Sequence, residues 1–244
     1  MKISFFEEFP DEKTLGKIKL IKFPTKLIVA AKSVKDFEKI KVKNVKETIY
    51  WPILDKKEGY WLSPFSKRTA LLRTIKELEN SDCKIMWDAE LPTRRARLFF
   101  TESNNFFRNR KTILEFFRKN GHRIYVSETM MPGFLEKMAE FLCVNFSPYK
   151  YKNYKIKMCY TSMRRFNLEK LYKRFADGVD KYGDHFLVAF GTIAVGILGN
   201  EPRLKADKLA RDIKIADKAG VKEIVIFRLG GLDKEYAKYL NDLS

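Results

Sequence analysis

The sequence predicts an α/β protein of the TIM-barrel class, a (β/α)8 barrel formed by residues 1–244 as a single domain. Eight short apolar segments with β-strand character alternate with helical segments along almost the whole chain. The length of 244 residues fits one such barrel. The first strand-to-helix turn holds Glu7, Glu8 and Pro10 in place of a G-x-G-x-x-G motif. This turn disfavours the main rival, a doubly wound dinucleotide-binding sheet.

The strands are expected where apolar, β-branched and aromatic residues run between turn residues. They span residues 3–8, 27–31, 48–53, 84–90, 123–127, 155–160, 186–191 and 223–227. Residues 144–163 contain two segments that look extended, and we take the second of them as the sixth strand. Pro92 is expected to end the pairing of the fourth strand.

The helices are expected where apolar residues recur at helical spacing between capping residues. They span residues 11–22, 34–40, 66–78, 104–119, 133–142, 167–181, 203–219 and 233–243. Ser33 is expected to cap the second helix, and Gly220 to end the seventh. Asn120 and Gly121 are expected to end the fourth helix in a left-handed conformation, and residues 91–103 to form a long loop.

The chain is strongly basic, with 49 Lys and Arg against 31 Asp and Glu and a formal charge of +18. The basic residues are spread over nearly every segment, and they cluster only at residues 94–97, 108–111 and 150–157. This spread makes nucleic-acid binding a secondary hypothesis, because a binding face usually needs clustered charge. The lysine-rich, glutamine-free composition resembles that of hyperthermophile proteins, which explains many charges without a ligand.

The three cysteines, Cys83, Cys143 and Cys159, form no C-x-x-C pair and lie among apolar residues. They are therefore expected to be buried free thiols in a reducing compartment. The first residues are too short and too acidic for a signal peptide, and no run of eighteen apolar residues occurs. We expect a soluble, cytoplasmic protein with no membrane partner, and the oligomeric state stays open.

Active sites of TIM barrels lie where the strands end, so the residues at those positions are the candidates for chemistry. They are Glu7 and Glu8, Lys32, Trp51, Asp88 with Glu90, Glu128, Tyr160 and Arg228. The strand period of two places Asp88 and Glu90 on one face of the fourth strand. His122 and His185 fall at the opposite, starting ends of strands. We therefore expect chemistry that uses carboxylates, Tyr, Lys and Arg, and no histidine-bound zinc.

Two short motifs carry a resemblance to a known family. Asp88-Ala-Glu90 and Met158-Cys-Tyr160 resemble the end of the D-x-x-D-x-D-x-E signature and the M-x-Y motif of family 18 glycoside hydrolases, the chitinase-like barrels. The resemblance implies that Glu90 protonates the glycosidic oxygen. It also implies that Asp88 orients the acetamido group of the substrate and that Tyr160 hydrogen-bonds the same region.

The chain departs from this family at several positions. Cys83 and Met86 stand where the earlier aspartates of the signature would be, and Arg228 stands where a tryptophan is expected. A second resemblance, to a barrel family of unknown function, concerns the C-terminal third and implies no activity. It rests on residues 196–202, 209–213 and 226–231.

The leading hypothesis is a glycoside hydrolase-like enzyme that acts on a sugar or glycan by carboxylate acid/base chemistry, without a cofactor. Glu90 would act as the general acid, kept protonated by partial desolvation and by its neighbour Asp88. Glu128 or Glu7 would act as base or nucleophile unless the substrate assists itself. The residues expected to bind the substrate are Glu7, Lys32, Trp51, Tyr60, Trp61 and Arg228.

Two alternatives remain open. The first is a Mg²⁺-dependent phosphate or phosphodiester enzyme, in which the glycine-rich turns at residues 191–199 and 230–231 hold phosphate beside Arg228 and Lys32. The residues that would hold Mg²⁺ are Glu7, Asp88, Glu90 and Glu128. The second is a non-catalytic barrel that binds nucleic acid or protein through its basic loops.

Overall fold

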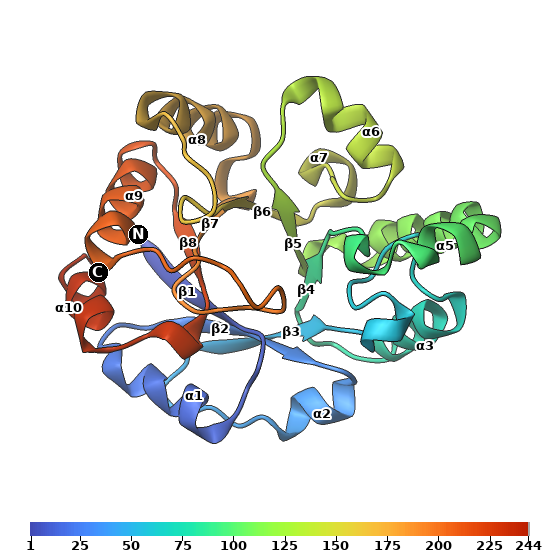
Figure 1. The fold of residues 1–244 in the computed structure, drawn as a ribbon, viewed down its shortest axis with the longest axis horizontal. Helices are drawn as coiled ribbons and strands as arrows, with labels where there is room; N and C mark the ends of the chain where they lie inside the picture. Colours follow the sequence, from blue (N-terminus) through green and yellow to red (C-terminus); the bar gives the residue numbers. More distant parts are fainter. Residues whose placement is uncertain (244) are drawn as a thin grey trace. The chain divides into compact units, whose positions relative to one another are not determined.

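The eight strands form one closed parallel barrel, as the computed structural model shows for residues 1–243, apart from the side chain of Arg94 (Figure 1). The strands follow one another around the barrel in chain order. This arrangement confirms the TIM-barrel fold predicted from the sequence.

The strands lie close to their predicted positions. They are β1 (Lys2–Glu7), β2 (Lys26–Ala31), β3 (Glu47–Pro52), β4 (Ile85–Asp88), β5 (Ile124–Thr129), β6 (Tyr154–Cys159), β7 (Phe186–Gly191) and β8 (Glu223–Phe227). The choice of the second extended segment in residues 144–163 as the sixth strand is confirmed.

Helices separate the strands. The α-helices are α1 (Glu12–Gly16), α2 (Val34–Lys39), α3 (Arg68–Glu79), α4 (Arg97–Thr101), α5 (Phe106–Asn120), α6 (Glu136–Phe141), α7 (Pro148–Tyr151), α8 (Leu168–Tyr182), α9 (Ala206–Lys218) and α10 (Lys234–Asp242). The 3₁₀ helices are η1 (Lys17–Leu20), η2 (Lys56–Glu58), η3 (Thr93–Arg95), η4 (Ser103–Asn105), η5 (Gly121–Arg123), η6 (Gly133–Leu135), η7 (Gly183–His185) and η8 (Leu229–Gly231).

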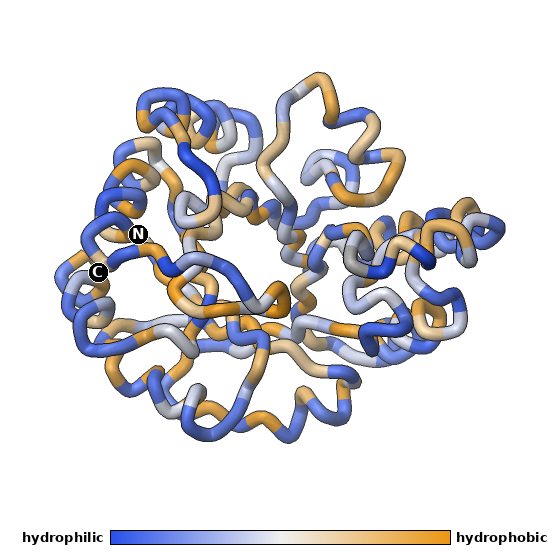
Figure 2. Tube along the Cα trace, in the orientation of Figure 1, coloured by the Kyte–Doolittle hydropathy of each residue, from blue (hydrophilic) through white to orange (hydrophobic). Residues whose placement is uncertain are grey.

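The chain divides into two compact units. The first unit comprises Met1–Val29, Lys41–Ile49 and Ile156–Ser244, and the second comprises Ala30–Ile40 and Tyr50–Lys155. In both, the hydrophobic residues concentrate in the strands, and the helices alternate between hydrophobic and hydrophilic residues (Figure 2). This is the pattern of parallel strands that are covered by helices.

In the first unit, β1 pairs with β8 and β8 with β7, all parallel. Every residue of β7 is buried. Outside the strands, α9 packs between α8 and α10 (Figure 1). A Cβ atom at Gly178 of α8 would lie 2.4 Å from the Phe186 ring, so glycine lets this helix approach β7 closely.

In the second unit, β4 pairs in parallel with β5 from Ile85 to Asp88. Trp87 is fully buried, and its ring meets that of Phe117 edge-on with centroids 5.2 Å apart. Phe117 in turn stacks on Phe146 at 3.8 Å. This aromatic cluster fixes β4 against α5 and so fixes the chain that follows Asp88.

Two details of the predicted helices were wrong. Residues 91–103 are not all loop, because they contain η3 and α4. Gly121 does not adopt a left-handed conformation: its φ is −52°, and the chain continues into η5. Glycine is needed there for a different reason, since a Cβ atom would lie 1.7 Å from the carbonyl oxygen of Tyr151. The predicted cap at Ser33 is confirmed. Gly220 follows the end of α9, as predicted, and has a φ of +84°.

The cysteines are free thiols, as predicted, but only two are fully buried. Cys143 and Cys159 are buried, whereas Cys83 is half-buried. Burial raises the pKa of each buried thiol to about 12, so neither is a ready nucleophile. Among residues 1–243, none of the helices is both long and apolar enough to span a bilayer.

Candidate active site

Asp88 and Glu90 follow the end of β4 in the second unit. Asp88 is the last strand residue, opposite Ser127 of β5, and the N–H of Ala89 still donates to the Ser127 carbonyl at 2.9 Å. The Glu90 N–H then donates to the Asp88 carbonyl at 3.0 Å, so the chain turns here. The prediction that strand period places Asp88 and Glu90 on one face of the fourth strand is wrong, because β4 ends at Asp88 and Glu90 lies beyond it. Both residues are partly exposed, whereas Ala89 between them is buried.

Glu128, near the end of β5, lies in a fully buried ion pair. Its Oε2 is 2.6 Å from Lys155 Nζ, and the two side chains are 0% and 2% exposed. Lys155 also donates to Asn145 Oδ1 at 2.7 Å, and the Phe146 N–H donates to Glu128 Oε1 at 2.7 Å. Charged partners that satisfy each other in this way are typical of a structural pair in the core. Lys155 and Asn145 were not among the residues predicted from the sequence.

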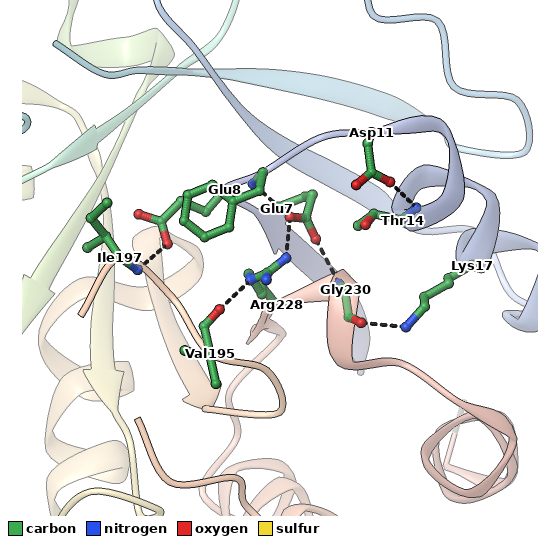
Figure 3. Close-up of polar contacts among 10 residues, drawn as sticks. Glu7, Glu8, Asp11, Thr14, Lys17, Val195, Ile197, Arg228 and Gly230 are labelled. Carbon is green, nitrogen blue, oxygen red and sulfur yellow. Dashed lines mark hydrogen bonds and ion pairs between the residues drawn. The ribbon is translucent and has the colours of Figure 1, made fainter. Parts of the chain in front are cut away.

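Glu7, the last residue of β1, is fully buried and forms an ion pair of the first unit with the partly exposed Arg228 (Figure 3). Its Oε1 is 2.6 Å from Arg228 Nη1, and its carboxylate accepts the N–H groups of Phe9 at 2.8 Å and Gly230 at 2.7 Å. Burial raises the pKa of Glu7 above its usual value, and the charge of Arg228 opposes this shift. Arg228 also donates to the Val195 carbonyl at 3.0 Å.

Arg228, expected to bind substrate or lie beside phosphate, is thus paired with the carboxylate of Glu7. The guanidinium carbon also lies 4.8 Å from the centre of the Phe9 ring. The ion pair between Glu7 and Arg228 therefore holds the chain that connects β8 to η8 against the end of β1. Lys17 donates to the carbonyl of Gly230 in the same cluster (Figure 3).

The glycine-rich turns proposed for phosphate are occupied by carboxylates of the chain itself. The N–H of Ile197 donates to Glu8 Oε2 at 3.0 Å (Figure 3). The N–H of Leu198 donates to Glu201 Oε1 at 2.9 Å. The Gly230 N–H donates to Glu7, as described above. A phosphate at these three amides would displace buried carboxylates, so the turns do not form a ready phosphate site.

The same glycines let the backbone pack tightly. A Cβ atom at Gly231 would lie 1.9 Å from the Ile193 carbonyl oxygen, and one at Gly230 would lie 2.3 Å from Arg228 Nη1. These close approaches explain the glycines without a ligand. Among residues 1–243, no group of three or more His, Cys, Asp and Glu side chains could hold a metal ion. The four carboxylates named for Mg²⁺ therefore form no such group.

The aromatic residues expected to stack on sugars are covered. Trp51, Tyr60 and Trp61 are 3%, 8% and 6% exposed, and the Tyr60 and Trp61 rings meet edge-on at 5.4 Å. Tyr60 adopts a φ of +61°, which turns the loop back onto the unit. The structure thus shows two of the predicted substrate-binding residues, Tyr60 and Trp61, packed and not exposed. Lys32 is exposed, and its Nζ is 2.5 Å from Asp55 Oδ1.

Tyr160 follows the end of β6 in the first unit and is partly exposed. Its ring lies 5.8 Å from that of Phe227, the last residue of β8. Tyr160 and Glu90 belong to different units, and their convergence in one site stays a prediction. His122 and His185 lie in η5 and η7, directly before β5 and β7, as expected.

A buried polar cluster around Asp212 of α9 was not predicted from the sequence. Asp212 is fully buried, accepts a hydrogen bond from Thr161 Oγ1, and receives Nε and Nη2 of Arg211 at 2.9 and 2.7 Å. The available signal was an aspartate among the apolar positions of a helix. Because its carboxylate is enclosed by these donors, we regard Asp212 as a structural link between α9 and the chain after β6.

The carboxylates near the strand ends thus fall into two groups. Glu7, Glu8, Glu128 and Glu201 are buried and accept hydrogen bonds from the chain. Asp88 and Glu90 are partly exposed. Reacting groups must contact the substrate, so the second group holds the better candidates.

No protein-family model matches the sequence, and a search of curated proteins gives no match. Solved structures do show similarity. A chitinase from Chromobacterium violaceum has a TM-score of 0.54 at 9% identity, with 100% of this chain and 99% of that chain covered. The spore cortex-lytic enzymes SleL of Bacillus megaterium and Bacillus cereus have TM-scores of 0.55 and 0.53, both at 10% identity. They cover 99% and 98% of this chain, and 73% of each of those chains is covered. At these identities the similarity concerns the fold alone, and at that level it confirms the resemblance to chitinase-like barrels.

Proposed function

We propose that this chain is a glycoside hydrolase that acts on a glycan with N-acetylated sugars, with Glu90 as the general acid. The observation that carries this proposal is the partial exposure of Asp88 and Glu90 after β4, whereas the other strand-end carboxylates are enclosed. The motif resemblance and the fold shared with a chitinase support the same class of reaction. Asp88 would orient the acetamido group of the substrate.

The proposed reaction proceeds in two steps. In the first, the protonated Glu90 gives its proton to the glycosidic oxygen while the acetamido oxygen of the substrate attacks the anomeric carbon. The bond to the leaving sugar breaks, and a cyclic intermediate remains. In the second step, a water molecule attacks the anomeric carbon while the Glu90 carboxylate takes its proton. The bond between the anomeric carbon and the acetamido oxygen breaks, and the acetamido group is restored.

The ion pairs of Glu128 and Glu7 support the use of the substrate's own acetamido oxygen as the nucleophile. Glu128 is fully buried against Lys155, and Glu7 is fully buried against Arg228. Either would have to leave its ion pair to attack a sugar, and separating such a pair costs several kcal/mol, about 3–5 kcal/mol. A nucleophile supplied by the substrate avoids this cost.

The acetamido group of the substrate is the most direct test of the proposal. We expect the chain to cleave N-acetylglucosamine oligomers and to leave the matched glucosamine oligomers uncleaved, because the latter lack the attacking oxygen. Product formation measured by chromatography compares the two substrates. NMR of the new reducing end should show retention of configuration at the anomeric carbon.

Two results would contradict the proposal in different ways. Equal cleavage of both oligomers would remove substrate assistance and return the role of nucleophile to a protein carboxylate. Failure to cleave any glycan with N-acetylated sugars, including peptidoglycan strands, would overturn the assignment as a whole.

A further inference from the structure

An exposed apolar patch lies on the second unit, where α5 and α6 are neighbours (Figure 1). We define it by Phe107, Phe134, Met138 and Phe141, which are 70%, 83%, 54% and 46% exposed. Phe100 on α4 is a further ring with 80% exposure. Such a group is unusual, because single exposed apolar side chains are common but contiguous apolar patches mark interaction sites.

The patch is continuous. Phe134, Met138 and Phe141 follow one another at intervals of four and three residues across η6 and α6, so they lie on one side. The Phe141 ring lies 6.3 Å from Phe107, and both rings rest on the buried Phe106 at 5.4 and 5.2 Å. Phe107 and Phe141 are thus held in place by Phe106, while their outer surfaces meet solvent.

The border of the patch is cationic. The Arg110 guanidinium carbon lies 5.1 Å from the centre of the Phe141 ring, and its Nε donates to the Phe141 carbonyl at 2.9 Å. Lys111 is one turn beyond Phe107 on α5, and Lys137 precedes Met138; both lysines are exposed. The acidic residues of α6 point away from the apolar stripe by helical spacing. They are Glu136 and Glu140.

We propose that this patch binds an anionic lipid surface, with Phe107, Phe134 and Met138 inserted at the boundary between headgroups and acyl chains. Protruding apolar side chains with a border of Lys and Arg fit such a surface, because the chains gain from leaving water and the cations attract anionic headgroups. The contact needs no membrane-spanning helix. It differs from the expectation, drawn from the sequence, that no membrane takes part.

Two other occupants fit the patch less well. A second copy of this chain would bring two cationic borders together in a protein that carries a net charge of +18. Single-stranded nucleic acid binds where ring faces are open along a basic groove. Here Arg110 covers one face of Phe141, and the Phe107 ring meets Phe141 and Phe106 edge-on at 70° and 86°.

The test is co-sedimentation of the purified chain with vesicles. We expect binding to vesicles of phosphatidylcholine with phosphatidylglycerol and much weaker binding to phosphatidylcholine alone. The double substitution Phe107→Ser with Phe134→Ser should weaken binding to the anionic vesicles by on the order of 100-fold. Lys111→Gln with Lys137→Gln should weaken it by on the order of 10-fold, and should do so less in high salt.

A matched control replaces exposed aromatic side chains outside the patch. Tyr172→Ser with Tyr239→Ser removes side chains that are 45% and 40% exposed and should leave vesicle binding unchanged. Circular dichroism and thermal unfolding check that each variant is folded. Absence of vesicle binding by the unaltered chain overturns the proposal, and so does binding that the Phe107 and Phe134 substitutions leave unchanged. If those substitutions instead abolish a dimer or the binding of single-stranded RNA, without vesicle binding, the patch serves that partner and the lipid proposal fails.

Discussion

Replacing Glu90 by Gln is expected to lower kcat for glycan hydrolysis by about 100- to 10,000-fold and to leave KM nearly unchanged. Glutamine keeps the shape of the side chain, but its amide is too weak an acid to protonate the glycosidic oxygen. The loss should depend on the leaving group, because an aryl leaving group with a low pKa needs little protonation. Steady-state kinetics on an N-acetylglucosamine oligomer and on its nitrophenyl glycoside measure this difference.

Glu79→Gln is the matched control for this substitution. Glu79 is exposed at the end of α3 in the same unit, so its replacement removes one carboxylate without touching the chain after β4. We expect the control to hydrolyse both substrates at the unaltered rate. If Glu90→Gln lowers kcat/KM, which reports the first step, equally for both substrates, Glu90 is not the proton donor. If it slows neither, Glu90 takes no part in catalysis.

The barrel could be predicted closely where the sequence bounds an apolar run on both sides. β7 and β8 occupy the predicted residues, Phe186–Gly191 and Glu223–Phe227, because each run is continuous and each is flanked by polar residues or glycine. The helix α4 has only five residues, fewer than two turns, so no helical period could show it. Gly121 shows the limit of residue preference: it suggests a left-handed cap, yet its role is contact with Tyr151.

The candidate site could be predicted only in part. Strand ends indicated which residues gather near the active side of a barrel, but not which of them are enclosed. Glu128 was a candidate base or nucleophile, and the structure pairs it with Lys155 at 2.6 Å. The partner in such an ion pair depends on which segment of the protein packs against the carboxylate. Strand period alone does not determine which segment this is. Lys155 alternates with apolar residues in β6, a pattern that sequence reasoning assigns to solvent.

Replacing Lys155 by Met is expected to lower the free energy of unfolding by about 3–5 kcal/mol. The substitution keeps most of the apolar stem but leaves the Glu128 carboxylate, which is 0% exposed, without the cation at 2.6 Å. Urea unfolding monitored by circular dichroism measures the change. Lys32→Met is the matched control, because Lys32 is 65% exposed beside Asp55 and such pairs contribute only about 0–1 kcal/mol.

The double substitution Glu128→Gln with Lys155→Met separates a structural from a catalytic role of Glu128. Glutamine keeps an oxygen that can accept the Phe146 N–H, and no buried charge remains, so we expect most of the lost stability to return. We also expect this variant to hydrolyse glycans, because the proposed reaction uses Glu90 and the substrate's own acetamido group. A stable but inactive double variant would make Glu128 a reacting carboxylate, and the buried ion pair would then have to open during each turnover.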